Sequence, residues 1–388
     1  MNFNFLSPVS DSVLAHNELL PTLALGRKLK IHSNQLGFPD LEDVSIAIIG
    51  VLENRNDINY LGEEFHLDEI RKTFYNLFPG NWNTVIADLG DIEKGETVQD
   101  TYFALRTSIS ILLQKNIIPI VLGGSQDLTY SVYRAYDEFM PMVNIVNVDK
   151  SFDLGDSSKP IKNNSFLGKV ILDKPYNLFN YSTIGYQTYF NSQEEIDLME
   201  KLYFEAHRLG EITNNINIVE PVMRDANIVS LDLNSIKSSE LSVKQKFSPN
   251  GFDGREICAI SRYAGISNKV SVFGIYEYKP SIKETVTEML LAQMLWYFIE
   301  GVNCRVKDDD FTKDHNYKKY TVIVEDDELI FYKSNQTGRW WIEIPFLSNV
   351  NNKLKRHTLL PCTYQDYIEA CENKIPERWF KAYKKNSL

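Results

Sequence analysis

The sequence is poor in cysteine, histidine and positive charge, and it contains no long apolar run. Four scattered cysteines in 388 residues are too few for a disulfide scaffold, which indicates reduced thiols. A net charge of -11 argues against nucleic acid as a partner, because phosphate binding depends on Lys and Arg. There is no run of roughly 18 apolar residues and no basic start followed by an apolar segment. We therefore expect a cytoplasmic protein without direct membrane insertion.

Apolar segments rich in β-branched residues alternate with segments of helical periodicity from residue 45 onwards. The run VSIAIIGVL (45–53) is typical of a strand that is covered on both faces. Helices are predicted near 67–78 and 96–116. Further strands are predicted at NIIPIVLGG, VNIVNVD, KVIL, YSTIGYQ, ANIVSLDL and VSVFGIYEY. This order predicts an α/β protein with three αβα layers and a mostly parallel sheet over residues 45–305.

The two ends of the chain have a different texture from this central region. Residues 1–44 hold scattered apolar positions and turn-forming pairs, which suggests a lead-in packed on the surface. Residues 306–388 begin with a charged linker and continue as an antiparallel β-meander of three strands with two short helices. We expect this last region to be an appendage to the α/β domain.

Polar side chains gather at the predicted carboxyl ends of the strands, where α/β enzymes place their functional groups. Carboxylates on separate strand ends that converge on one crevice would suggest a divalent metal site with oxygen ligands. Lys150 directly precedes Ser151, and its side chain is expected to point to the opposite side of the strand if the strand continues that far. The candidate site residues are Ser125, Gln126, Asp149, Ser151, Asp153, Asp232, Asn234 and Glu277.

The order of these motifs resembles the ureohydrolase family of arginase, agmatinase and formimidoylglutamase. The family's G-G-D-H-S is similar to GGSQD (123–127), its D-A-H-x-D to DKSFD (149–153), and its S-x-D-x-D to SLDLN (230–234). Its D-I-M-E-V-N-P segment is similar to GIYEYKP (274–280). The resemblance implies an arginase-like fold and hydrolysis of guanidino or formimino groups by a hydroxide that bridges two manganese ions. Two histidines and four aspartates hold those ions in the family.

Half of that ligand set is absent from this chain. Gln126 and Ser151 stand where the family has histidines, and Asn234 replaces an aspartate. Amide and hydroxyl oxygens are much poorer ligands for divalent first-row metals than imidazole, and none of the six histidines lies in a strand-end motif. We therefore expect no catalytic residue and no cofactor. If any metal binds, the surviving ligands are Asp149, Asp153 and Asp232.

Two functions follow from these observations. The first is a catalytically inactive ureohydrolase-fold protein that serves as a binding, scaffolding or regulatory component of a cytoplasmic assembly, with a protein as its partner. The alternative is a metal-dependent hydrolase of a C–N bond in a linear amidine, with formimidoylglutamase-like or agmatinase-like activity. That alternative needs manganese, held as a weak single ion or with the help of a displaced histidine. Both functions are compatible with a homo-oligomer.

The candidate acids also have simpler interpretations. The three aspartates could cap turns and accept hydrogen bonds from backbone N–H groups. Glu277 could hold a cationic group of a ligand, as the resemblance suggests, or it could be solvated at the end of its strand.

Overall fold

The centre of the molecule is a ten-stranded sheet in the order β1-β4-β3-β5-β10-β9-β6-β7-β8, with β2 also paired to β4. The structure is a computed structural model that describes residues 3–156, 158–241, 248–280, 285–308, 316–325, 327–345 and 359–387. Strands β2 to β10 pair in parallel, whereas β1 is antiparallel to β4. The strands are β1 (Leu6–Ser7), β2 (Lys30–Ile31), β3 (Ile46–Val51), β4 (Ile86–Ile92), β5 (Ile118–Gly123), β6 (Val143–Val148), β7 (Leu178–Tyr186), β8 (Glu205–Arg208), β9 (Ile228–Asp232) and β10 (Val272–Tyr276).

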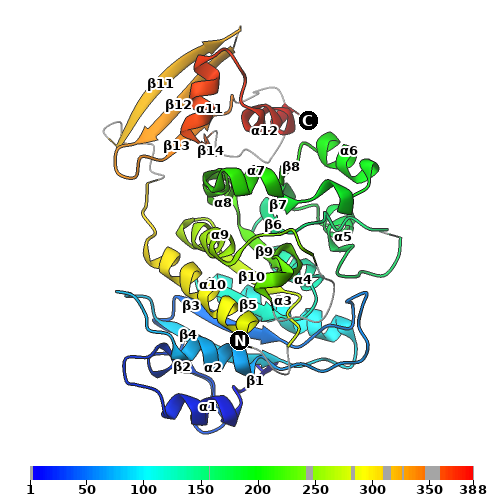
Figure 1. Ribbon diagram of the computed structural model, residues 1–388, viewed down its shortest axis with the longest axis vertical. Coiled ribbons are helices and arrows are strands. Elements are labelled where there is room, and N and C mark those ends of the chain that lie inside the picture. The colour runs from blue at the N-terminus through cyan, green and yellow to red at the C-terminus, as the bar shows by residue number, and fades with distance from the viewer. Residues whose placement is uncertain are drawn as a thin grey trace.

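Helices cover both faces of this sheet, which confirms the predicted three-layer architecture (Figure 1). Strand β3 shows why its sequence is apolar throughout: Ile46 and Ile48 enter one core, and Ala47 and Ile49 enter the other. One core is covered by α2 (Asp68–Asn76), α7 (Leu209–Asn214), α8 (Val219–Asp225), α9 (Gly254–Ile266) and α10 (Val286–Asn303). The other is covered by α3 (Val98–Gln114), α4 (Leu128–Arg134), α5 (Phe166–Leu172) and α6 (Gln193–Lys201).

The run KVIL (169–172) is helical, so the prediction of a strand there was wrong. These residues form the end of α5, which buries Phe166, Leu167 and Val170 on one side. A short apolar run fits either a buried strand or a buried helix, because both place several apolar side chains in a row against a core. The structure selects the helix, since the positions i, i+1 and i+4 share one face.

The residues before β3 extend the sheet at its edge. Strands β1 and β2 both pair with β4, and α1 (Asp11–Glu18) begins at an N-cap formed by Ser10. Val13 of this helix is fully buried in the same core as α2 and α10. The lead-in therefore contributes backbone pairing as well as surface cover. Within the described residues, no helix is long and apolar enough to cross a membrane.

A second sheet with its own core follows α10 (Figure 1). Its four strands are antiparallel, and the first three form the predicted meander. A fourth strand, β14, pairs with β13, so the prediction of three strands was one short. The elements are β11 (Tyr317–Val324), β12 (Asp327–Ser334), β13 (Trp340–Glu343), β14 (Leu359–Cys362), α11 (Tyr364–Cys371) and α12 (Glu377–Ser387).

Arg224 of α8 joins this second unit to the main domain. Its guanidinium donates to the carbonyl oxygens of Trp340 at 3.0 Å and Cys362 at 3.1 Å. It also lies 4.6 Å from the ring centroid of Trp341. From the second unit, Arg378 of α12 reaches back to Glu205 of β8 at 2.8 Å. The appendage is thus docked through buried arginine contacts.

Candidate functional site

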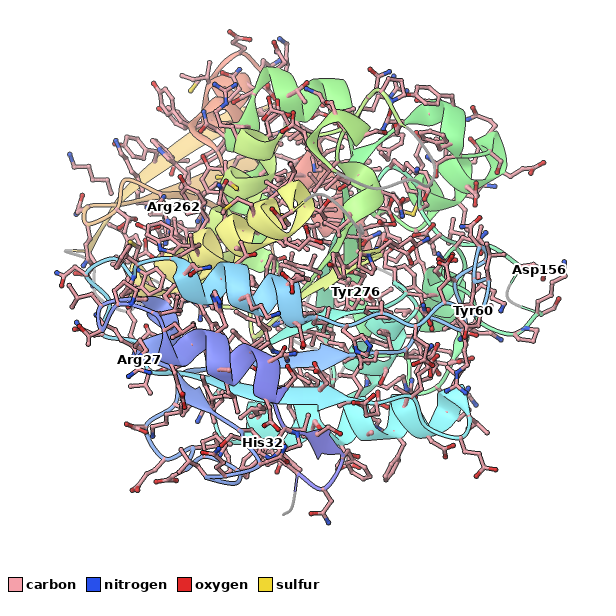
Figure 2. All side chains as sticks on the ribbon, turned by 60° about the horizontal axis from the view of Figure 1, so that its bottom comes forward. Arg27, His32, Tyr60, Asp156, Arg262 and Tyr276 are labelled. Atoms are coloured by element: carbon pink, nitrogen blue, oxygen red, sulfur yellow. The ribbon has the colours of Figure 1, made fainter. Side chains whose placement is uncertain are left out.

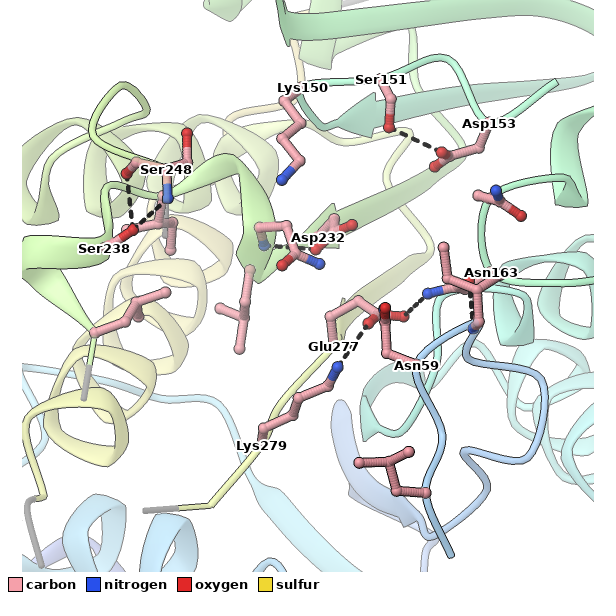
Figure 3. Close-up of a pocket in the computed structure, with 17 residues that line it drawn as sticks. Asn59, Lys150, Ser151, Asp153, Asn163, Asp232, Ser238, Ser248, Glu277 and Lys279 are labelled. Atoms are coloured by element: carbon pink, nitrogen blue, oxygen red, sulfur yellow. Dashed lines mark hydrogen bonds and ion pairs between the residues drawn. The ribbon is translucent and has the colours of Figure 1, made fainter. Parts of the chain in front are cut away.

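The strand order places the carboxyl ends of β5, β10, β9 and β6 next to one another. In Figure 2, Tyr60 and Asp156, from the loops after β3 and β6, lie toward the same side of the molecule, opposite to Arg27 and Arg262. A cavity of about 530 Å³ opens at these strand ends (Figure 3). Five of the predicted site residues line it: Ser151, Asp153, Asp232, Asn234 and Glu277. Gln126 and Asp149 lie buried beside it, and Ser125 lines a neighbouring cavity of about 440 Å³.

The Gln126 side chain stands where three carboxyl groups meet. In the amide orientation that pairs donors with acceptors, its nitrogen donates to Oδ2 of Asp149 and Asp153 at 3.0 Å and to Oδ2 of Asp232 at 3.2 Å. The amide oxygen then lies 2.7 Å from Oδ1 of Asn147, so the Asn147 amide must be turned as well for its NH₂ group to donate to Gln126. The chain itself therefore supplies a hydrogen-bond donor to all three surviving acids.

The other oxygen of each of these acids stabilises a local turn. Oδ1 of Asp149 accepts from the backbone N–H groups of Lys150 at 2.5 Å and Ser151 at 3.2 Å. Oδ1 of Asp232 accepts from the backbone N–H of Asn234 at 2.5 Å, and Asp153 accepts from the Ser151 hydroxyl at 2.8 Å. The turn-capping interpretation thus accounts for one oxygen of Asp149 and one of Asp232, whereas Asp153 accepts from a side-chain hydroxyl. The convergence on Gln126 accounts for the other oxygen of each group.

Burial disfavours the charged form of these acids. It raises the pKa of Asp153 to about 7, and it raises the pKa values of Asp149 and Asp232 well above their ordinary range. The proximity of Asp153 adds to the effect at Asp149, since two carboxylates repel when both are ionised. An NH₂ group has only two hydrogens for three acceptors. A proton retained on one of the carboxyl groups lets the cluster share those hydrogens.

Glu277 closes a second network at the edge of the cavity. Its Oε1 accepts from the Gln126 backbone N–H and from the Asn163 amide, both at 3.0 Å. The ammonium of Lys279 lies 3.9 Å from Glu277 Oε2 and 2.6 Å from Asp57 Oδ2. Asn163 also donates to Asp57 Oδ1 at 3.2 Å. Glu277 is therefore engaged in an internal network. The interpretation that it is solvated at the end of its strand was wrong.

Backbone conformations in the left-handed region occur at both of these networks. Asp153 has a φ of 55° and Glu277 a φ of 64°. Non-glycine residues reach this region at a cost of order 1–2 kcal/mol, and such residues concentrate at sites where a side chain is held in a particular direction. Both side chains line the cavity of about 530 Å³.

Lys150 lines the same cavity as Ser151, and the condition for their opposite directions, a strand that continues to residue 150, is not met. Strand β6 ends at Val148, so the alternation of faces does not extend to residues 149–151. The ammonium lies 4.9 Å from the ring centroid of Phe190. Figure 3 shows the Lys150 side chain extending toward Asp232.

Asp57, Asn163 and Lys279 were missed by reasoning from the sequence. Asp57 lies in the loop six residues beyond β3, and Asn163 lies in the loop between β6 and α5, so neither occupies a strand end. Lys279 was visible as the lysine in GIYEYKP, where the family segment has asparagine. That substitution was the one available signal, and the meeting of the three residues depends on the path of the loops.

A pair of manganese ions does not fit this set of side chains. Gln126 supplies an amide at the point where the three carboxyl groups converge, and Ser151 and Asn234 add a hydroxyl and an amide. Among the residues that the structure describes, no group of three His, Cys, Asp or Glu side chains is arranged to hold a metal ion. No histidine contributes to the described walls of either cavity. The geometry of the described residues therefore does not support a displaced histidine as a substitute metal ligand.

The fold and the cluster of strand-end acids define a protein of the ureohydrolase class. A family model described as the arginase family matches residues 44–300. The chain belongs to the arginase family. This assignment confirms the resemblance that the strand-end motifs indicated.

Similarity to individual proteins is more distant. A formimidoylglutamase of Hahella chejuensis is 30% identical over 146 residues, which are 35% of this chain and 44% of that protein. A formimidoylglutamase of Geobacillus is 23% identical over 58% of this chain and 72% of that protein. A crystal structure of Trypanosoma cruzi formiminoglutamase with Mn²⁺ superposes with a TM-score of 0.61 at 19% identity, covering 69% of this chain and 96% of that one. The agmatine ureohydrolase of Thermoplasma volcanium gives 0.59 at 20% identity, with 75% and 97% covered.

Proposed function

We propose that this arginase-family protein is catalytically inactive and acts by binding, as a scaffolding or regulatory component of a cytoplasmic assembly. The observation that carries the proposal is the Gln126 amide among Asp149, Asp153 and Asp232. In this arrangement a neutral donor of the chain satisfies the carboxyl groups that would otherwise require a cation. The acids are retained as a structural cluster.

The chemistry of hydrolysis explains why this arrangement matters. Making hydroxide at neutral pH requires a metal that lowers the pKa of bound water. The amide and hydroxyl groups at positions 126, 151 and 234 are weak, uncharged donors for such a metal. No histidine lines the described parts of the cavities to act as a general base in its place.

A binding function is supported by what the molecule retains. The cavity of about 530 Å³ has the size of a site for a small ligand. The C-terminal unit presents β11 at the edge of its sheet, where the described pairing involves β12 alone. An edge strand of this kind can pair with an extended segment of a partner. We propose a protein partner at this edge and a polar ligand or no ligand in the cavity.

Metal analysis and turnover assays test the proposal together. The full chain is purified with Mn²⁺ present, and bound metal is measured by mass spectrometry. Release of urea or formamide is measured with arginine, agmatine and formimidoylglutamate as substrates. We expect less than stoichiometric metal and no turnover. Two manganese ions per chain together with hydrolysis of any of these substrates would contradict the proposal.

The second candidate is a metal-dependent amidine hydrolase of the formimidoylglutamase or agmatinase type. It is favoured by the names of the relatives and by the convergence of three aspartates on one point. The variant Gln126→His/Ser151→His/Asn234→Asp separates the two candidates. We expect it to gain Mn²⁺ affinity at least tenfold over the wild type. The hydrolase would be favoured if the wild-type chain is active and the triple variant has the same turnover.

A further inference from the structure

The two cavities at the strand ends share part of their walls. Asn59, Glu277 and Lys279 line both the cavity of about 530 Å³ and the neighbouring cavity of about 440 Å³. These side chains therefore stand between the two spaces. Lys279 lies in the segment that follows β10, and its side chain extends toward Glu277 (Figure 3).

The Lys279 ammonium pairs closely with Asp57 and lies near Glu277, two acids that belong to different loops. It lies 2.6 Å from Asp57 and 3.9 Å from Glu277. The carboxylate side chains are 5% and 2% exposed, whereas Lys279 is 26% exposed. The Asn163 amide joins the same two acids from another direction. Both acids thus share an amide donor, and Asp57 receives a cation from within the protein beside Glu277.

We propose that Lys279 is an internal cation that occupies the Asp57 and Glu277 pair and thereby closes this part of the cleft to amidinium, guanidinium and alkylammonium ligands. A ligand of that class would have to displace an ammonium that is covalently tied to the site, so it competes against a very high effective concentration. The proposal extends the proposed function by naming the ligand class that the cleft excludes. It does not depend on whether a metal binds.

Three observations support this role beyond the ion pair itself. Asp57 is held in place by Asn59, whose backbone N–H donates to it at 2.8 Å and whose side-chain amide donates at 3.1 Å. Glu277 is held by its strained backbone and by Gln126. The carboxylates are therefore fixed before the cation arrives. Such a preorganised acidic pair binds a cation well when its own is removed, because little ordering remains to be done.

Replacement of Lys279 by alanine tests the proposal by complementation. The change removes the atoms of n-propylammonium from the wall between the cavities. We expect n-propylammonium and agmatine to bind Lys279→Ala at least tenfold more tightly than the wild type, measured by isothermal titration calorimetry without metal. The Tm of the variant should rise by about 2 °C or more near saturation with n-propylammonium. Propionate and sodium chloride at equal ionic strength should produce no such rise.

Matched variants keep the test decisive if the alanine variant is less stable. Lys279→Arg retains the cation, and it should bind n-propylammonium and agmatine no more tightly than the wild type does. Lys159→Ala removes an exposed lysine that pairs with Asp156 at 3.2 Å, and it should bind no more than the wild type. Adding Glu277→Gln to Lys279→Ala should abolish the gain, because one carboxylate of the pair is lost. Circular dichroism shows whether each variant is folded before binding is measured.

Two results would overturn the proposal. One is binding of agmatine or n-propylammonium to the metal-free wild type as tightly as to Lys279→Ala. The other is a folded Lys279→Ala that binds neither probe better than Lys159→Ala does. Neither result depends on metal or turnover, so the inference and the proposed function can fail separately.

Discussion

The side-chain amide of Gln126 donates to Oδ2 of Asp149 across 3.0 Å and thereby connects the end of β5 to the end of β6. The same nitrogen reaches Asp153 and Asp232, so one neutral side chain serves carboxyl groups from two other strand ends. Gln126 is 1% exposed, and solvent cannot replace it as the donor. The stability of this region therefore depends on an amide where the family motif has histidine.

Truncation of this amide is expected to destabilise the protein. Gln126→Ala should lower the free energy of unfolding by about 2–4 kcal/mol, because it leaves a cavity and removes the donor from three buried acids. The measurement is urea-induced unfolding. Gln193→Ala provides the control, since its amide donates to Asp197 on an exposed helix surface, and it should change stability by less than about 0.5 kcal/mol. Equal effects of the two changes would contradict a structural role for Gln126.

Arg71 links α2 to β4 through two acids of that strand, Asp88 and Asp91. It donates to Asp88 at 2.9 Å and to both carboxylate oxygens of Asp91 at 2.9 Å. Arg71→Met should lower the free energy of unfolding by about 3–5 kcal/mol, because it leaves buried carboxylates without their cation. Lys72→Met breaks a solvent-exposed pair with Glu69 and should cost less than about 1 kcal/mol. Thermal unfolding of both variants distinguishes the buried pair from the exposed one.

Docking of the C-terminal unit is expected to depend on Arg224. Arg224→Ala removes the donor to the carbonyl oxygens of Trp340 and Cys362 and the contact with Trp341. We expect a loss of about 2–3 kcal/mol and faster proteolysis in the segment after α10. Limited proteolysis with mass spectrometry locates the cleavage sites. Arg255→Ala, at an exposed position on α9, should leave the cleavage rate unchanged.

A pH-dependent contribution to stability is expected at β8. Burial alone would lower the pKa of His207, but the carboxylates of Glu205 and Glu211 raise it to about 9. The ordinary pKa is 6.5, so the contribution is fully present below about pH 6.5 and is lost as the pH rises through 9. The stability difference between wild type and His207→Gln should shrink by about 3 kcal/mol from pH 6 to pH 10. A difference that is independent of pH would show that the imidazole is not charged in the folded state.

Much of the fold could be predicted because periodicity and composition act locally. The apolar run at 45–53 predicted a strand buried on both faces, and β3 does divide its side chains between two cores. The segment at 96–116 predicted a helix, and α3 spans Val98–Gln114 with a capping box at Thr97 and Asp100. At KVIL, by contrast, three apolar residues did not define a period, and the packing of Phe166 and Val170 decided for a helix.

The residues of the candidate site were likewise named from the sequence, since the ends of parallel strands share one edge of a sheet. The amino-acid sequence by itself determined that three aspartates remain and that Gln126, Ser151 and Asn234 replace stronger ligands. Only the tertiary structure decided that the Gln126 amide faces all three acids and that Lys279 stands between Asp57 and Glu277. Those relationships join β5, β6, β9, β10 and the loop after β3, and contacts between such distant segments arise from strand order and loop path, which no local pattern encodes.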